Sequence, residues 1–506
     1  MRSVLKGLAL LAFFTCARSW LLQAGRRPSS PLPRVFKPVT GSDAVSTTRL
    51  FLETKEESVM AVESDSVVVT GSGDNKGPST KSIVFVLLSA LAIAISYADR
   101  SNLSTAIIPM AREFKWDNFF SGVVLSSFWA GYATTQVLGG ALADSLGGEA
   151  LLLVAMLLWS VATALTPAAA AAGAVQVVAA RVVLGAGEGL ALPAIHSMIA
   201  KYVNLPQKNL AAATVTSACY LGALTSNYVA PKIIEAFDWK TCFYAFATVP
   251  SLVWIPLWLG FLAWARQSKR LGSSSENALA ASREGETADK GDSPSISTLL
   301  KAPPVWAIIA GQYGQSWGMI GLLSWLPTYY SQRFDVPIAS LSDFTVLPYF
   351  LQLGVSILAG YISDALIGRG VRTLTVRKVL QTVGMLAPAV CLGYCSYATN
   401  LGAAQAAQLI TLGSSLSALT VGAVSCNHFD ISRKNAGTIF GIGNTASCIG
   451  GLIAVPVSGY LFDLTHSWSA VFALFALHYA GGAILYNLWA SDTPLLISSK
   501  TETAES

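Results

Sequence analysis

The sequence is poor in charged residues. Asp, Glu, Lys and Arg occupy only 12% of its 506 positions, whereas an average soluble protein has about 25%. Hydrophobic residues make up 53%, and the mean hydropathy is +0.53. A soluble domain of this length needs more polar surface than this, because accessible surface grows with chain mass. The net charge of +5 is small and spread along the chain, which argues against a nucleic-acid partner. The composition predicts a membrane protein.

Groups that could form a catalytic or metal centre are also scarce. The four histidines (His196, His428, His466, His478) are isolated, and the seven cysteines are scattered with no His or Cys pair at metal-ligand spacing. The sequence contains no glycine-rich phosphate loop and no Gly-x-Ser-x-Gly elbow. We therefore expect neither an enzyme nor a resident cofactor or metal.

Residues 1–80 differ from everything that follows. Met1–Ser19 has a basic start and an apolar run too short to span a bilayer, as in a secretory signal peptide. The next stretch, to Arg49, is rich in Arg and Ser and poor in acids, as in an organellar transit peptide. We expect a leader that directs the protein to a plastid envelope, followed by a disordered spacer. A disordered cytoplasmic tail is the alternative, with the plasma membrane or an endomembrane as the location.

Twelve hydrophobic segments follow, six on each side of a polar stretch rich in Ser, Glu and Lys. Each must be helical in lipid, because backbone groups find no water there. We expect an all-α membrane protein with twelve transmembrane helices in two six-helix bundles, 81–265 and 302–490, joined by a flexible loop, 266–301, and ending in a disordered tail, 491–506. The predicted spans are 83–107, 119–141, 150–169, 173–200, 210–232, 242–265, 304–326, 342–363, 378–397, 402–426, 436–461 and 469–490.

A short motif recurs at the same place in each half. Gly140 and Asp144 stand at the end of the second span, and Gly360 and Asp364 at the end of the eighth, each time with another Gly soon after. We interpret the Gly as a site of close helix approach and the Asp as a group that bonds a neighbour. The motif resembles the loop signature of the major facilitator superfamily, which implies alternating access between two halves. Asp144 and Asp364 are then the expected gating residues. The family loop usually continues with Arg or Lys, whereas Glu149 stands here.

Only two of the 33 Lys and Arg residues, Arg100 and Arg181, fall inside apolar spans rather than at their ends or outside them. An Arg in mid-membrane costs at least about 2.5–3.5 kcal/mol, so it needs a partner, a wet cavity or a ligand. Glu188 lies two helical turns after Arg181 on the same face, with Gly185 and Gly189 placed for close helix packing. One interpretation is structural, with Arg181 paired to Glu188, or Arg100 to Asp99. The other is an anion site of two guanidinium forks, with Glu188 carrying a coupling proton.

The segments YADRSNLSTAIIPM, RVVLGAGEGLALPAIHSMIAKYV and NHFDISRKNAGTIFGIGNTAS resemble the anion:cation symporter branch of that superfamily. This branch includes sodium–phosphate cotransporters, sialin, vesicular glutamate transporters and plant plastid phosphate and ascorbate transporters. The resemblance implies substrate binding by Arg100 and Arg181 and coupling by Glu188. It also implies a transport role for His428 in the NHFD segment, where a cap or hinge at the end of the tenth span is the equal alternative.

Further polar residues are expected around the cavity: Asn102, Tyr132, Gln315 and Asn444. A helix–helix hydrogen bond is the simpler role for Asn444. The vesicular glutamate transporters have a histidine where Leu125 stands and an arginine where Gln315 stands. We therefore expect a monomeric secondary transporter of a small anion in the lipid bilayer, inorganic phosphate first. Ascorbate, glutamate or another carboxylate is the alternative, and protons, sodium or the membrane potential drive transport. A membrane-embedded enzyme or a receptor on the same fold are the remaining alternatives.

Overall fold

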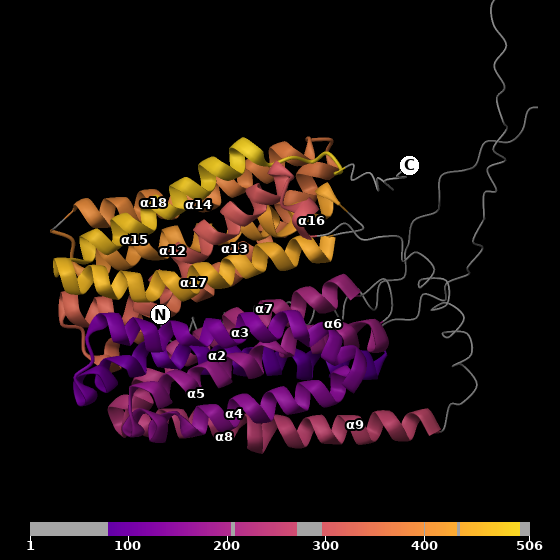
Figure 1. The fold of residues 1–506 in the computed structure, drawn as a ribbon, viewed down its shortest axis with the longest axis horizontal. Coiled ribbons are helices and arrows are strands. Elements are labelled where there is room, and N and C mark those ends of the chain that lie inside the picture. The colour runs from indigo at the N-terminus through magenta and orange to yellow at the C-terminus, as the bar shows by residue number, and fades with distance from the viewer. Residues whose placement is uncertain (1–78, 204–207, 271–295, 399, 433–435, 496–506) are drawn as a thin grey trace, which may run out of the picture.

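The computed structural model describes residues 79–203, 208–270, 296–398, 400–432 and 436–495, and these contain helices and no strand. The predicted leader and spacer, apart from 79–80, lie outside the described residues, as do most of the central loop and the end of the tail. The helices form two bundles, one from each half of the sequence, which lie side by side (Figure 1).

The N-terminal bundle runs from Thr80 to Arg270. Its helices are α2 (Thr80–Phe114), α3 (Asn118–Leu146), α4 (Gly148–Ala172), α5 (Ala174–Gly189), α6 (Ala191–Tyr202), α7 (Lys208–Ala236), α8 (Trp239–Val249), the π-helical turn η2 (Pro250–Trp254) and α9 (Ile255–Arg270). The fourth predicted span is broken at Leu190, two residues after Glu188. The sixth consists of α8, η2 and α9 and extends past the predicted boundary at residue 265.

The C-terminal bundle has the same plan. Its helices are α11 (Ile296–Leu299), α12 (Pro303–Phe334), η3 (Ile338–Ser340), α13 (Ser342–Gly368), α14 (Thr373–Tyr397), α15 (Ala403–Ser417), η4 (Ala418–Gly422), α16 (Val424–Ile431), α17 (Ala436–Thr465) and α18 (Trp468–Trp489). The tenth predicted span is interrupted between η4 and α16, at Ala423. Interrupted helices of this kind are common in transporters, where freed backbone groups can face a binding site.

Nine helices or helix groups in the described chain are long and apolar enough to cross a membrane. The three other predicted spans coincide with α3, α7 and α12, which are of similar length but more polar. Each of these helices packs against the opposite bundle: α3 against α17, α7 against α13, and α12 against α2. A helix surface that faces the other bundle rather than lipid can keep polar residues, which is compatible with the lower hydropathy of α3, α7 and α12.

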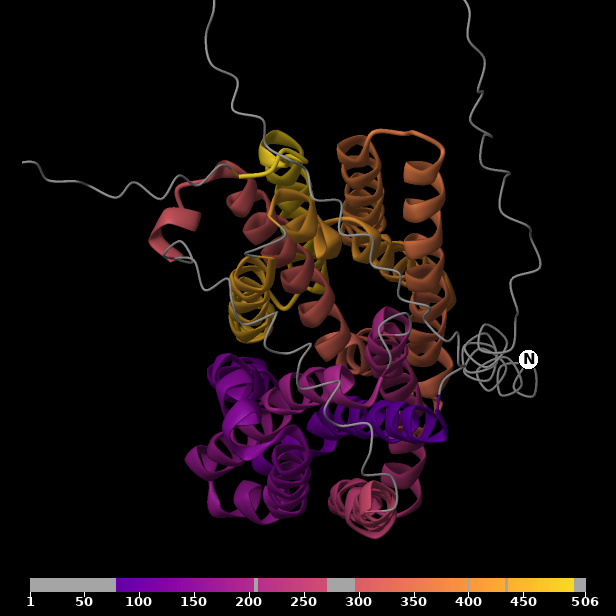
Figure 2. The same ribbon diagram turned by 90° about the vertical axis from the view of Figure 1, so that its right-hand side faces the viewer.

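The buried core shows where the two halves are joined. At the end away from the chain termini, one hydrophobic cluster continues across both bundles, from Leu103 and Trp239 to Trp325 and Phe472. At the end that holds the termini, the apolar clusters belong almost entirely to one bundle or the other. Figure 2, which views the terminal end, shows the two bundles as separate groups of helices. The structure is therefore closed at the end away from the termini, the far end.

Candidate functional site

Arg100 of α2 and Glu188 of α5 form an ion pair inside the N-terminal bundle. Arg100 Nη2 lies 2.9 Å from Glu188 Oε2, and Ser96 Oγ donates to the same oxygen at 2.7 Å. Only 14% of the Arg100 side chain is exposed, and none of the Glu188 side chain. Neither of the two pairings considered from the sequence is the ion pair observed. Seven residues along a helix correspond to about 10.5 Å, so Arg181 and Glu188 share a face without being within ion-pair distance.

Four aromatic rings surround the guanidinium group of Arg100. Its central carbon lies 4.2 Å from the ring centre of Phe128 and 4.3 Å from that of Tyr97. Trp129 and the predicted cavity residue Tyr132 follow at 5.0 and 5.1 Å. Trp129 packs against Gly451 of α17, in the opposite bundle. Arg100 therefore lies at the interface between the two halves, where cation–π contacts hold the charge in an apolar setting.

Arg181 is buried deeper, with 1% of its surface exposed. Its Nε and Nη1 atoms have no hydrogen-bond partner among the described residues, although Glu188, Asp99 and Arg100 act on it electrostatically. Asn102, another predicted cavity residue, is also buried with both amide atoms unpartnered. A buried cation with unused donors can accept an anion, because unpaired donors in a low-dielectric site are costly.

Asp99 is the residue whose position the sequence interpretation missed. The sequence analysis considered it only as a counter-charge for Arg100. In the structure it is fully buried, it accepts a 3.4 Å hydrogen bond from Thr163, and it interacts electrostatically with Arg181 and Glu188. Consecutive helical residues point in directions about 100° apart, so Asp99 and Arg100 face different neighbours. The sequence feature that could have indicated its burial is an acid directly beside an Arg within an apolar span.

Two glycines set the position of Glu188. A Cβ atom at Gly185 would lie 2.0 Å from the carbonyl oxygen of Phe128, and one at Gly189 would lie 2.6 Å from that of Tyr132. The predicted close helix packing is confirmed: α5 lies directly against α3. This approach brings the carboxylate of α5 and the aromatic residues of α3 to the same guanidinium group.

The other predicted site residues are spread over both bundles. Asn444 Nδ2 donates to Gln136 Oε1 of α3, which is the helix–helix hydrogen bond expected as its simpler role. Gln136 in turn donates to the hydroxyl of Tyr132 at 3.4 Å. Gln315 is half-buried in α12. His428 is buried in α16 beside Phe440, and its Nδ1 has no partner among the described residues.

The two repeated motifs differ in their surroundings. Asp144 lies near the end of α3, and its side chain is outside the described residues, whereas Asp364 is exposed on α13. A methyl group placed on Gly360 would meet no atom within 4 Å. The interpretation of this Gly as a close-approach site is wrong, because no neighbour of α13 lies on that face in the part of the chain that the structure describes. Glu149, the departure from the family loop, binds Lys201 and accepts a 2.9 Å hydrogen bond from Tyr202.

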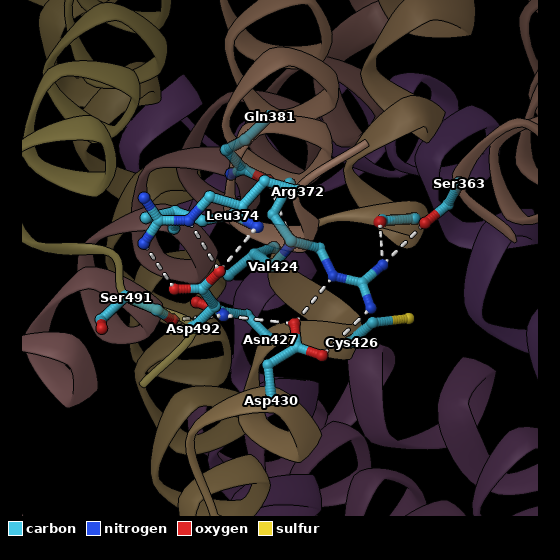
Figure 3. A network of polar contacts seen from close by, with 12 residues as sticks. Ser363, Arg372, Leu374, Gln381, Val424, Cys426, Asn427, Asp430, Ser491 and Asp492 are labelled. Atoms are coloured by element: carbon cyan, nitrogen blue, oxygen red, sulfur yellow. Dashed lines mark hydrogen bonds and ion pairs between the residues drawn. The ribbon is translucent and has the colours of Figure 1, made fainter. Parts of the chain in front are cut away.

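Charged residues of the C-terminal bundle form a network at the terminal end (Figure 3). Arg377 binds Asp430 at 2.8 Å and also donates to Ser363 Oγ and the carbonyl oxygen of Gly422, each at 2.7 Å. Asp430 follows His428 by two residues, so this ion pair fixes the end of the broken tenth span. It favours the cap or hinge interpretation of the NHFD segment.

Residues Ser491–Leu495, called the C-terminal strap, belong to the same network. Asp492 accepts hydrogen bonds from Arg372 and from the backbone of Leu374, while the Ser491 carbonyl accepts one from Asn427. The hydrogen bonds from Arg372 hold the pKa of Asp492 below its ordinary value. This corrects the expected disordered tail for its first residues: the described part of the tail is tied to α14 and α16.

The family model of the Major Facilitator Superfamily matches residues 89–455. The chain belongs to the major facilitator superfamily. Its members are secondary transporters built from two repeated halves, so the chain is not an enzyme and is a multi-pass membrane protein.

Several similar proteins of plants are named as chloroplastic transporters. The chain is 34% identical over 418 residues to "Probable anion transporter 4, chloroplastic" of Oryza sativa, covering 81% of this chain and 69% of the relative. It is 32% identical to "Ascorbate transporter, chloroplastic" of Arabidopsis thaliana, over 85% and 80% of the two chains. It is also 32% identical to "Sodium-dependent phosphate transport protein 1, chloroplastic" of the same plant, over 82% and 80%.

Solved structures share the fold. The inward-open xylose transporter XylE from E. coli superposes with a TM-score of 0.63, covering 80% of this chain and 95% of that one at 15% identity. At this identity the likeness shows the fold alone. The predicted all-helical fold of two bundles is confirmed.

Proposed function

We propose that this protein moves a small anion across a plastid envelope by alternating access, and that inorganic phosphate is its substrate. The observation that carries this proposal is the pair of guanidinium groups in the N-terminal bundle. Arg100 lies at the interface of the halves, and Arg181 is buried nearby with two unused donor atoms. Guanidinium forks match the oxygen geometry of phosphate and carboxylate groups. The names of the plastid relatives support the substrate class and the location.

Charge balance in the site supports a coupled mechanism. With both acids ionised, Arg100, Arg181, Asp99 and Glu188 sum to zero charge. An anion that enters this buried group leaves it negative, which is unfavourable where the dielectric is low. Uptake of a proton, or of a sodium ion, restores the balance. Glu188 is the proposed proton carrier, because its protonation weakens its hold on Arg100 and leaves that guanidinium group available to the anion.

An organic anion is the second candidate. The rings of Tyr97, Phe128, Trp129 and Tyr132 around Arg100 offer an apolar surface, which suits a carboxylate with a carbon skeleton better than it suits phosphate. One relative is named an ascorbate transporter. Ascorbate, glutamate and related carboxylates are therefore the competitors to include in any substrate test.

The proposed residues have different parts in the cycle. Arg100 and Arg181 bind the anion, while Asn102, Tyr132, Gln315 and Asn444 line or brace the path between the halves. Asp144 and Asp364 contribute to gating at the terminal end, and His428 to the hinge beside Arg377 and Asp430.

Uptake of radiolabelled phosphate into liposomes tests the proposal. Arg100→Ala and Arg181→Ala should each reduce uptake at least about tenfold, because each removes charge-assisted hydrogen bonds to the anion. Arg372→Ala is the control, since it removes a positive charge from a side chain that is 65% exposed and lies at the terminal end. Undiminished uptake in both site variants would overturn the proposed anion site. Uptake of radiolabelled ascorbate or glutamate without uptake of radiolabelled phosphate would favour the organic anion.

The coupling ion and the membrane need separate tests. A pH gradient and a sodium gradient, imposed one at a time on the same liposomes, identify the driving ion. Glu188→Gln should lose gradient-driven accumulation but keep exchange of internal for external substrate. Residues 1–80 fused to a fluorescent protein should direct it to plastids; fluorescence at the plasma membrane would contradict the proposed location.

A further inference from the structure

We propose that Asp463 stabilises the closed state of the far end of the transporter, by capping a helix of the opposite bundle. Asp463 lies two residues before the end of α17, in the C-terminal bundle. Its Oδ2 accepts a 2.8 Å hydrogen bond from the backbone N–H of Phe119. Its Oδ1 accepts bonds from the side chain and backbone N–H of Asn118, at 2.6 and 3.3 Å. Asn118 and Phe119 are the first two residues of α3, in the N-terminal bundle.

The start of α3 therefore receives its caps from both halves of the protein. The first N–H groups of any helix lack partners within the helix and carry a partial positive charge. Asp117, in the same bundle, accepts from the N–H of Phe120 at 2.7 Å. Asp463 supplies the acceptor for the two preceding N–H groups. One carboxylate stays with α3 wherever it moves, whereas the other must leave when the halves separate.

The contacts around Asp463 show that α3 and α17 must separate before the far end can open. A Cβ atom at Gly459 would lie 2.2 Å from the carbonyl oxygen of Asn118, and one at Gly122 would lie 2.7 Å from the Cα of Pro456. Gln332 of α12 donates to the Asn118 side chain at 3.2 Å. α3 and α17 are thus in backbone contact here, and the Asn444–Gln136 hydrogen bond lies about 27 Å further along α3. No path to the substrate site can open at the far end while these contacts persist.

The proposal for Asp463 rests on one part of the proposed function: a transporter that works by alternating access must open at both ends. In the closed state the charge of Asp463 is matched by the α3 N-terminus; in the open state both are solvated. Removing the charge therefore weakens the closed state alone. Since Asn keeps one acceptor oxygen but lacks the charge, we expect Asp463→Asn to increase the ratio of far-open to far-closed molecules about tenfold.

Asp117→Asn is the matched control. It removes one negative charge at the same helix terminus, and Asn caps as well as Asp, but its contact lies within one bundle. It should leave the ratio of the two states unchanged. Asn118→Ala is a second test variant: it removes the 2.6 Å donor to Asp463 without altering any charge, and should shift the ratio in the same direction by a smaller factor.

The experiment measures the distance between spin labels at Phe237 and Tyr397 in lipid nanodiscs without substrate. Both residues are exposed at the far end, one in each bundle. A longer-distance population in Asp463→Asn and Asn118→Ala, absent in Asp117→Asn, supports the gate. An unchanged distribution in the two test variants, or equal shifts in all three, would overturn it. Because no substrate is present, the result does not depend on phosphate uptake, and failed uptake with an intact gate response would count against the substrate proposal only.

Discussion

Loss of the carboxylate of Glu188 should destabilise the N-terminal bundle more than any single surface change. In Glu188→Ala, Arg100 loses the ion-pair partner that it has among the described residues, and Ser96 loses its acceptor. The Nε of Arg100 already lacks a hydrogen-bond partner in the described chain, and Arg181 loses one of the two acids that act on it. Two poorly compensated cations then remain in a site with almost no solvent contact.

The size of this effect follows from the geometry of the pair. Breaking a buried ion pair by removing one partner costs about 3–5 kcal/mol. Glu188→Gln keeps an oxygen that can accept from Arg100 and Ser96 and loses only the charge. Because charge-assisted hydrogen bonds are roughly twice as strong as neutral ones, we expect the Gln variant to lose about half as much stability, about 2 kcal/mol.

Thermal unfolding of purified protein in one detergent gives the comparison, with wild type, Glu188→Gln and Glu188→Ala measured side by side. Added phosphate should stabilise the Ala variant relative to its own apo form, because an anion can occupy the site of the missing carboxylate. An Ala variant as stable as wild type, or Gln and Ala variants of equal stability, would refute the assignment of Glu188 as the partner that neutralises Arg100.

Two further predictions concern packing and the C-terminal strap. Gly185→Ala should lower the free energy of unfolding by about 1–3 kcal/mol, because it overpacks α5 against α3. Gly360→Ala adds a methyl group where no described atom lies within 4 Å, so it should leave that free energy unchanged or raise it by up to about 1 kcal/mol. Equal melting temperatures of the two variants would contradict this. Asp492 has a lowered pKa in the folded protein, so its stabilising contribution is present above the unfolded pKa of about 3.9 and is lost as the pH falls through the folded pKa. Asp492→Asn should weaken the hold of Arg372 on the strap at neutral pH, which hydrogen exchange of the strap would detect; exchange identical to wild type would contradict it.

Much of the site could be predicted from the sequence because charges within apolar spans are so unfavourable. Arg100, Arg181 and Glu188 stand out in the sequence on that ground, and the structure places all three within electrostatic reach of one another. Their pairing could not be predicted. It depends on how closely α5 approaches α3, and that distance is set by backbone contacts at Gly185 and Gly189.

The partners of charged residues outside the spans were harder to predict from the sequence than the site within the spans. Asp463 lies just after the eleventh predicted span, and nothing nearby in the chain indicates that it caps α3. The start of α3 lies 345 residues earlier. Arg372 and Asp492 are likewise far apart in sequence. Polar residues at helix ends have many possible partners in water, so composition and spacing do not select one of them.

The sequence by itself determined that this chain enters a membrane, that it has two similar halves, and that Arg100, Arg181 and Glu188 lie within apolar spans. Those properties follow from transfer free energies, which depend on residue type and segment length. Only the tertiary structure decided which charges pair, which end is closed and which helices face the opposite bundle. These depend on contacts between distant segments, and a displacement of one ångström is enough to make or break a hydrogen bond.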